Sequence, residues 1–426
     1  MRKIIQYMMM ALIAVVLASC ANDISEESTP TVKSNIRFVV DDFPMFEKPS
    51  TRTIGEEDKG KTAWAVGDEI CVKLESKELG TQTATLKYNG VKFEIQDGNS
   101  LCYLDGEPVT AYAYYAPNRR WRNGSLDFKD IYGNPNGTAE FLEATCTVHY
   151  GDNNYVDISF ANATRNYSRL RIATIPKTEI KVDADNFAPT DNPNRLYMTY
   201  TLTSDEKGNA YLYGTFYNNS IVTVKYRGAT LKTYKFSKET VNAKSYALDA
   251  TVVSLTDEGI TYDQIVEDVK KELDAGKTYI NLILAPDADE ETLDAIHIGL
   301  QDAGYGSINL TLIGCKKIPS RGFMYCKMLK SIALPDVTEI EGNAFLDCTG
   351  LQKVVLGNLT KVYGNVGKKG IFDGCRTEDI DLVLSKDQKV MNGGETEGRY
   401  CWTAGSDEHD GRVFLGYDFK SITCDY

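Results

Sequence analysis

The feature that most constrains this chain is a repeat that runs from Ser307 to Leu384. Segments that begin at Phe323 and Phe345 keep the same apolar positions in phase, and a looser copy begins at Phe372. A fixed period in the low twenties indicates stacked units, because no unit of this size can bury its apolar face alone. We therefore expect one short strand per unit and a shared interior. The predicted repeat core consists of Ile318, Phe323, Cys326, Leu329, Ile332, Leu334, Ile340, Phe345, Cys348, Leu351, Val354, Leu356, Phe372, Cys375 and Leu382.

Helical patterns precede the repeat. Thr261 and Gln264 have the spacing of a capping box, and the apolar residues that follow recur with a helical period as far as Gly276. A second helical pattern runs from about Asp289 to Ala303. We expect these helices to form a first unit, because the end of a stacked core has to be covered. Residues 254–426 are thus assigned to one domain with N- and C-terminal caps.

The segment from Ile340 to Leu356 resembles a unit of the BspA-like leucine-rich repeat family of bacterial surface proteins. Units of that family read roughly Ile-(x)4-Ala-Phe-(x)2-Cys-(x)2-Leu-(x)2-Ile-x-Leu-Pro, and this segment fits almost position for position. It has three residues between Ile340 and Ala344, Val354 at the second Ile position and no final Pro, which Pro335 supplies in the unit before. The resemblance implies an α/β leucine-rich repeat solenoid. The outward face of its strands would carry Lys330 and Lys353 as possible ligand contacts, although a solvated face is the default expectation.

The N-terminus has the pattern of a lipoprotein signal. Arg2 and Lys3 precede a short apolar run that ends in Leu-Ala-Ser-Cys at Cys20. This ending resembles the bacterial lipobox, so we expect residues 1–19 to be removed and Cys20 to carry lipid such as palmitate. An ordinary signal peptide with a chance cysteine is the alternative. The apolar run is too short to span a membrane. We expect an outer membrane lipoprotein exposed at the cell surface, with residues 20–33 as an acidic tether.

Charge and cysteine usage narrow the choice of partners. The formal net charge of −13 argues against a nucleic-acid partner, because an acidic surface repels phosphate backbones. Ten cysteines in an exported chain could form disulfides. However, Cys326, Cys348 and Cys375 recur in phase with the repeat, which favours small buried side chains over bridges. An occasional disulfide, such as Cys401 with Cys424, stays open.

Two β-rich blocks lie between the tether and the repeat. Residues 34–146 and residues 147–253 both contain short alternating apolar runs separated by turn residues, with no helical period. Asn89-Gly90 between two such runs is a strong hairpin signal, because both residues accept a positive φ. Several short strands of this kind predict a β-sandwich in each block.

Motifs in both blocks resemble the Bacteroidetes fimbrillin-like family. They are Thr51-Arg-Thr53, Trp64-Ala-Val-Gly-Asp-Glu-Ile-Cys-Val72, Ser159-Phe160 and Ser168-Arg-Leu-Arg-Ile172. The resemblance covers about half of the chain. It implies two consecutive transthyretin-like sandwiches, in a family of pilus subunits and surface adhesins. The expected fold class is therefore two all-β sandwiches followed by an α/β leucine-rich repeat solenoid.

Signatures of catalysis are missing from the sequence. The three histidines accompany no nucleophile elbow, no zinc-binding spacing and no phosphate loop. We expect no enzymatic activity, no cofactor and no metal. One aromatic and basic stretch, with Tyr115, Arg120 and Trp121, has a composition suited to ligand or sugar contacts. The alternative is a strand whose aromatic side chains lie in the core, followed by a basic loop.

These observations predict a cell-surface lipoprotein that binds a protein or glycan ligand through a short repeat held on a fimbrillin-like stalk, as in cell adhesion. The first alternative is an anchor, tip or accessory subunit of a fimbrium, joined to other subunits by strand donation. The second alternative is a glycan-binding surface lipoprotein, which rests on the aromatic stretch alone.

Overall fold

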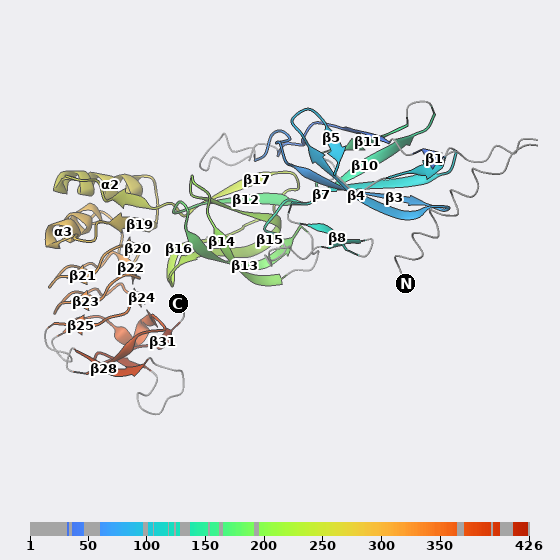
Figure 1. Cartoon of the computed structure of the whole chain (residues 1–426). Coiled ribbons are helices and arrows are strands. Elements are labelled where there is room, and N and C mark those ends of the chain that lie inside the picture. The colour runs from blue at the N-terminus through green and yellow to red at the C-terminus, as the bar shows by residue number, and fades with distance from the viewer. Residues whose placement is uncertain are drawn as a thin grey trace, which may run out of the picture.

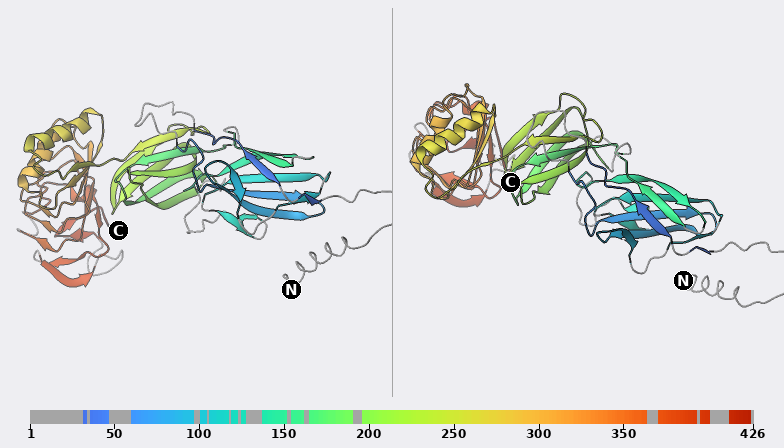
Figure 2. Two further views of the ribbon diagram at one scale, coloured as in Figure 1. Left: turned by 45° about the horizontal axis from the view of Figure 1, so that its top comes forward. Right: turned by 90° about the horizontal axis from the view of Figure 1, so that it is seen from above.

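A computed structural model divides the chain into three β-rich bodies that follow one another in sequence order (Figures 1 and 2). It describes residues 32–33, 36–46, 60–96, 101–104, 106–117, 119–122, 125–127, 137–151, 154–161, 165–190, 196–363, 370–392, 395–400 and 412–424. The predicted lipid attachment at Cys20, the signal peptide and Cys401 lie outside these residues. We call the parts up to residue 161, from 165 to 250, and from 251 onward the first, second and third body.

The first body is a curled seven-stranded sheet in the order β2-β11-β10-β7-β3-β4-β5. The side chains of Ile70, Val72 and Leu74 in β3 are fully buried, as the period of two in a strand predicts. β2 and β5, at the two ends of this order, contact each other and close the sheet around its core. The strands are β2 (Arg37–Val40), β3 (Glu69–Ser76), β4 (Gly80–Tyr88), β5 (Phe93–Ile95), β7 (Val109–Tyr115), β10 (Leu142–His149) and β11 (Tyr155–Ser159), with the short pairs β1 (Val32–Lys33) with β6 (Tyr103–Leu104) and β8 (Arg120–Arg122) with β9 (Ser125–Asp127).

The boundary between the first two bodies lies later than residues 146 and 147, where we placed it. Strand β10 runs across that point, and β11 pairs antiparallel with β10 and parallel with β2, inside the first sheet. The alternation in β11 marks an inner and an outer face, but it does not say which sheet the strand joins. The first body therefore ends near Phe160, and the second begins near Ser168.

The second body is a six-stranded sheet that folds over on itself. Its path is β14-β13-β15-β12-β17, and β16 pairs with β15. The long strand β15 pairs with β12 along its first half and with β16 along its second half, while β13 follows both halves through a bulge. Phe187, Tyr200 and Phe216 fill the interior. The strands are β12 (Ser168–Ala173), β13 (Glu179–Pro189), β14 (Leu196–Thr203), β15 (Asn209–Tyr226), β16 (Ala229–Lys235) and β17 (Ser245–Asp249).

The third body stacks two sheets around one apolar core. The larger sheet has the order β18-β19-β20-β22-β24-β26-β31 and is parallel throughout; the smaller has the order β21-β23-β25-β28-β27. Figure 1 shows successive strands of the third body one above the other. The larger sheet contains β18 (Val253–Leu255), β19 (Tyr279–Leu284), β20 (Ile308–Ile313), β22 (Leu329–Leu334), β24 (Lys353–Leu356), β26 (Asp381–Leu384) and β31 (Ser421–Cys424). The smaller contains β21 (Lys317–Ile318), β23 (Glu339–Ile340), β25 (Lys361–Val362), β27 (Lys389–Asn392) and β28 (Glu395–Tyr400), and β29 (Val413–Phe414) pairs with β30 (Tyr417–Asp418).

Equivalent residues of successive units touch inside this body. The rings of Phe323 and Phe345 stack with centroids 5.9 Å apart, and those of Phe345 and Phe372 with centroids 5.2 Å apart. The thiol of Cys348 donates to the carbonyl of Phe323 at 2.8 Å. Every residue of the predicted repeat core is buried in this one cluster except Cys375, which is half-buried and packs against it. Each unit thus contributes side chains to the apolar core that it shares with its neighbour.

The prediction of an α/β leucine-rich repeat solenoid is wrong. Among the described residues the α-helices are α2 (Tyr262–Asp274) and α3 (Glu290–Gly299), both before the repeated units, and a 3₁₀ turn, η2, spans Thr377–Asp379. The capping box of Thr261 and Gln264 that starts α2 is confirmed. Within the units, the second short strand and a turn take the place of a helix. Residues with positive φ, such as Arg321 and Tyr325, interrupt that turn, and a helix cannot continue through them. The chain is therefore nearly all β, built from sandwich-like and barrel-like sheets.

Removing one ring from the stack should be costly. We expect Phe345→Ala to lower the free energy of unfolding of the third body by about 3–5 kcal/mol, because the ring is fully buried between two others. Urea-dependent hydrogen exchange of the amides in β22 and β24 measures this change. The control Gln352→Ala, at an exposed position beside β24, should change it by less than about 0.5 kcal/mol. Equal effects of the two substitutions would show that the stack does not support the core.

Candidate functional site: the outer face of the parallel sheet and the two joints

The outer face of the larger parallel sheet was the predicted ligand surface. In β22, Ile332 faces the core while its neighbour Ala333 faces outward, because side chains alternate along a strand. The parallel register places Ala333 beside Val355 and Val355 beside Val383. The outward side chains of three successive units thus form one apolar row.

The second body covers this row. Ala229, at the start of β16, forms a buried cluster with Ala333, Val355 and Val383, and all of them are at most 6% exposed. β16 also contacts β19, β20 and β22. The predicted display face is therefore an interface within the chain. A ligand cannot reach this row while the two bodies are in contact.

Polar contacts fix the same joint at its margins. Arg227 forms an ion pair with Asp336 of the third body, with Nη1 and Oδ1 2.5 Å apart. The side-chain amide of Asn281 donates to the carbonyls of Leu231 at 3.1 Å and Thr251 at 3.2 Å. The Asn281 side chain is buried, so separating the bodies would leave its amide without partners. The Arg227 side chain is 56% exposed, so its ion pair contributes less.

Lys277 forms two further ion pairs beside the segment that connects the second and third bodies. Lys277 contacts Asp249 at 3.0 Å and Glu272 at 2.8 Å. Burial alone would raise the pKa of the Asp249 carboxyl, but hydrogen bonds from Thr251 and Lys277 outweigh it and hold that pKa below its ordinary value. Asp249 is therefore charged at neutral pH, and its pair stabilises the connection until the pH falls through that lowered pKa.

A cleft of about 980 Å³ opens beside this joint. It lies between β13, β14 and β15 of the second body and the ends of β22, β24 and β26 in the third. Lys353, one of the predicted ligand contacts, lines it together with Tyr197, whose side chain is 66% exposed. Basic side chains outnumber acidic ones here, and Asp183 is already paired with Lys225 at 2.7 Å. The remaining charged lining residues are Lys177, Glu179, Lys181, Arg227, Lys386 and Asp387.

The joint between the first and second bodies is built on a buried ion pair. The guanidinium of Arg165 lies 3.2 Å from Glu140, donates to the carbonyl of Pro44 at 3.1 Å, and covers the ring of Phe46. Burial raises the pKa of Glu140, although the charges of Arg165 and Arg169 oppose that rise. Removing either charge would leave the other buried without a partner, which is strongly destabilising.

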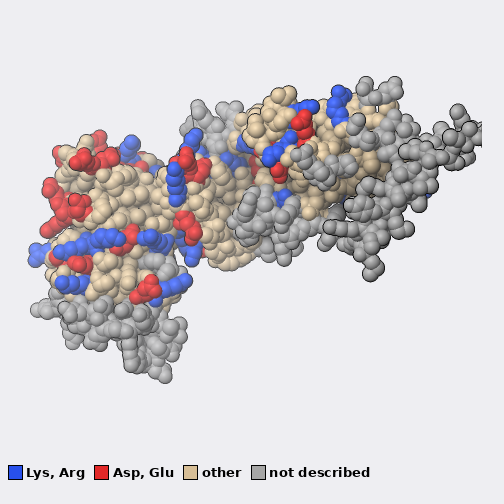
Figure 3. Space-filling view, viewed as in Figure 1, with Lys and Arg blue, Asp and Glu red and all other residues tan. Residues whose placement is uncertain are grey.

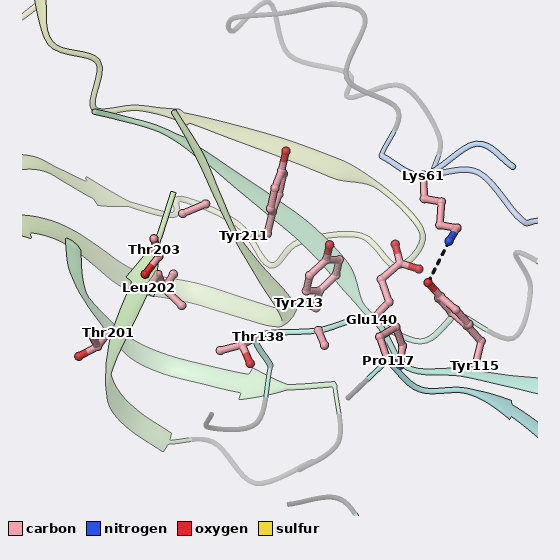
Figure 4. Close-up of a pocket in the computed structure, with 12 residues that line it drawn as sticks. Lys61, Tyr115, Pro117, Thr138, Glu140, Thr201, Leu202, Thr203, Tyr211 and Tyr213 are labelled. Carbon is pink, nitrogen blue, oxygen red and sulfur yellow. Dashed lines mark hydrogen bonds between the residues drawn. The ribbon is translucent and has the colours of Figure 1, made fainter. Parts of the chain in front are cut away.

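A small cavity of about 490 Å³ adjoins this pair (Figure 4). Glu140 lies between Tyr115 and Tyr213, and the Lys61 ammonium donates to the Tyr115 hydroxyl at 3.2 Å. Lys61 also pairs with Asp68. Burial, with the nearby carboxylates of Asp68 and Glu140, raises the pKa of the Tyr115 hydroxyl. Tyr115, a predicted ligand contact, is therefore part of the core of the first body, where its ring packs edge-on against Phe43 and Trp64.

The other predicted contacts lie apart from one another. Trp121 is half-buried and packs edge-on against Tyr114, with centroids 6.0 Å apart. Arg120 belongs to β8, and its side chain lies outside the described residues. Lys330 is exposed on the third body. The aromatic stretch and the repeat face therefore do not form one site.

Sequence reasoning missed the residues that hold the joints. Glu140 and Arg165, like Arg227 and Asp336, are far apart in the chain and follow no periodic pattern. Buried charges at both ends of a body would signal such joints, but their burial can be seen only in three dimensions. Among the described residues no group of His, Cys, Asp and Glu could hold a metal ion, and no helix is long and apolar enough to cross a membrane.

Comparisons with known proteins add no family to this description. No family model matches the chain, and no curated protein matches it. A solved structure of a candidate cell adhesion protein from Bacteroides fragilis is 12% identical, covers 53% of this chain and 94% of its own, and has a TM-score of 0.24. A variant of the shaft pilin from Lactobacillus rhamnosus is 12% identical, covers 52% of this chain and 96% of its own, and has a TM-score of 0.19. Both scores are too low to carry an argument, and neither the fimbrillin-like nor the BspA-like resemblance finds a matching family.

Substituting one member of the buried pair at the first joint should lower the free energy of unfolding more than substituting both members together. We expect Glu140→Leu and Arg165→Met each to lower the free energy of unfolding by about 3–5 kcal/mol, because each leaves one buried charge without its partner. The double variant should lose much less than the sum of the two, since it leaves neither charge. Urea unfolding of the three variants measures this coupling. Additive losses would contradict a joint held by this pair.

A charge in the apolar row should detach the third body from the second. We expect Val355→Asp to destabilise the joint by about 3–5 kcal/mol, because the carboxylate would be buried without a partner. Limited proteolysis within residues 251–260 should become faster. The control Gln352→Asp adds the same charge at an exposed position nearby and should leave proteolysis unchanged. Cleavage of both variants at the wild-type rate would contradict the interface.

Proposed function

We propose that this chain is a non-catalytic cell-surface lipoprotein in which the first and second bodies form a stalk that holds the third body away from the membrane for ligand binding. The observation that carries the proposal is that both joints are filled and charge-paired. Neighbouring domains move relative to one another by default unless the interface between them is large and hydrophobic. Here the second and third bodies share buried apolar clusters. A restrained array of three bodies suits a spacer.

The order of the bodies supports this arrangement. The lipobox-like cysteine, Cys20, and the acidic tether precede the first body in sequence. Figures 1 and 2 show the second body between the first and the third. A chain attached at Cys20 would therefore present the third body farthest from its lipid. The partners that this proposal implies are the membrane, through the lipid, and a protein or glycan at the cell surface.

The packing of the third body against the second limits which of its surfaces a ligand can reach. The outer face of the larger sheet is occupied by β16, so a ligand must use the turns of the units, the smaller sheet or the cleft beside Lys353. Membership of a fimbrium, as an anchor, tip or accessory subunit, is the competing reading. No feature of the described residues favours it over the stalk.

Replacing the lipid-bearing residue tests the proposal. We expect Cys20→Ala to release the chain from the membrane fraction and to abolish incorporation of labelled palmitate, because no other lipid site is predicted. The wild-type chain should also be cleaved by protease added to intact cells. Fractionation of the variant with membranes, or protection of the wild-type chain in intact cells, would overturn the proposal. Detergent-resistant ladders in surface extracts would favour the fimbrial reading instead.

A further inference from the structure

One unit of the third body carries a concentrated positive charge. No acidic residue lies between Gly314 and Pro335, a segment in which every lysine and arginine is exposed. Figure 3 shows Lys and Arg side chains gathered in a band across the third body at the level of β21, with acidic side chains gathered above it over α2 and α3. We call the exposed basic residues of this unit, together with the exposed Tyr325, the basic band: Lys316, Lys317, Arg321, Tyr325, Lys327 and Lys330.

The next unit shows that the fold does not require this charge. Lys317 pairs in parallel register with Glu339, which sets the correspondence between the two units. At the same offset, the positions of Arg321, Lys327 and Lys330 are taken by Asn343, Thr349 and Gln352 respectively. The same turn therefore forms without a basic residue at these places.

The residue types at two left-handed positions also differ between the units. Arg321 has a φ of 64° and Tyr325 a φ of 62°, both in the left-handed region. The residues at the place of Tyr325 in the following units are Asp347 and Gly374, and Asn343 stands at the place of Arg321. Asn, Asp and Gly accept this conformation readily, whereas long or bulky side chains are strained in it. Lys177, Arg227, Ala243 and Leu415 also have a positive φ, so this conformation shows where the unit departs from its neighbours and is not by itself a site.

Part of the basic band has no acidic partner. Lys317 is paired with Glu341 at 2.6 Å, and Lys316 lies 3.9 Å from Asp336. For Arg321, Lys327 and Lys330, the described part of the chain offers no acidic group within ion-pair distance. Tyr325 is 52% exposed among them. The three cations and the ring are thus available to a ligand.

The surroundings of the basic band limit the width of that ligand. Acidic side chains on α2 and α3 lie on one side, and Glu339 and Glu341 of the next unit lie on the other. Neighbouring strands are about 4.8 Å apart, so the band is about one unit wide, which is less than the screening length of about 8 Å at physiological salt. A wide polyanion would meet these carboxylates, whereas a single linear chain that lies along the band would not.

We propose that the basic band binds a linear anionic polysaccharide, with its sulfate or carboxylate groups on Arg321, Lys327 and Lys330 and a sugar ring against Tyr325. Arginine and lysine are the side chains that bind such anions, and an exposed aromatic ring offers its face to a sugar. This assignment rests on the proposed function, because polymers of this class are met at the cell surface. It names the ligand class of the third body.

Substitution with the residues of the next unit tests the assignment without disturbing the fold. The probe is the mature chain with Cys20→Ser, on immobilised heparin, polygalacturonate and neutral dextran. The variant Arg321→Asn/Lys327→Thr/Lys330→Gln should keep the wild-type melting temperature and lose at least tenfold in affinity for one of the two anionic polymers. The control Lys207→Thr/Lys238→Gln/Lys270→Gln removes the same charge from exposed positions elsewhere and should bind within twofold of wild type. Tyr325→Asp should weaken binding further.

The outcomes separate the possible sources of binding. Preference for heparin assigns a sulfated ligand, and preference for polygalacturonate assigns a uronate ligand; either supports the proposal. It is overturned if the wild type binds neither polymer, if both triple variants lose affinity equally, or if single-stranded DNA binds as tightly as the polysaccharides. Because the assay uses purified protein, failure here leaves the stalk and lipid anchor untouched. Loss of surface exposure in the Cys20→Ala test would not explain a failure to bind.

Discussion

The packing of β16 against the outer face of the larger parallel sheet determines which surfaces of the molecule are left for a partner. Small outward side chains make this contact possible, because Ala229 and Ala333 let two backbones approach closely and Val355 and Val383 fill the space beside them. Burial of these groups is favourable in proportion to the apolar area removed from water. Because this row is covered, a ligand cannot bind to the outer face of the larger sheet. A ligand of the third body would have to bind at the turns and edges of the units instead.

The first joint is held by a buried ion pair in place of an apolar row. There, the interface holds the Arg165 guanidinium against Phe46 and beside Glu140. A buried pair of this kind adds little net stability compared with apolar residues, but it penalises any arrangement that separates its members. One joint is thus fixed by apolar packing with ion pairs at its margin, and the other by an ion pair at its centre. Together they connect the three apolar cores.

The sequence indicated the repeat and its phase but not the architecture built from it. The in-phase positions from Ile318 to Leu382 lie in one core, because apolar periodicity reports directly on burial. A strand-and-turn unit and a strand-and-helix unit share that periodicity, so the predicted α/β solenoid could not be told from the nearly all-β structure. Periodicity likewise did not assign β11 to its sheet. The joints depend on pairs such as Arg227 with Asp336, which no local pattern links.

The basic band can also be recognised in the sequence when the units are aligned. Aligning the units places Arg321 and Tyr325 opposite Asn343 and Asp347, residue types that favour a positive φ. The departure from turn-forming residues in one unit, together with its lack of acidic residues, marks the basic band. By contrast, Tyr115 of the aromatic stretch is buried in the core of the first body, because aromatic side chains on a strand bury a large apolar area.

Thiol labelling of the sheet face tests the central claim most directly. A cysteine introduced as Ala333→Cys should react with maleimide in the folded chain only as slowly as the buried native thiols, whereas Gln352→Cys on the same body should react at once. Rapid labelling of both positions in the folded chain would show that the outer face is open, and the account of which surfaces remain for a ligand would fail.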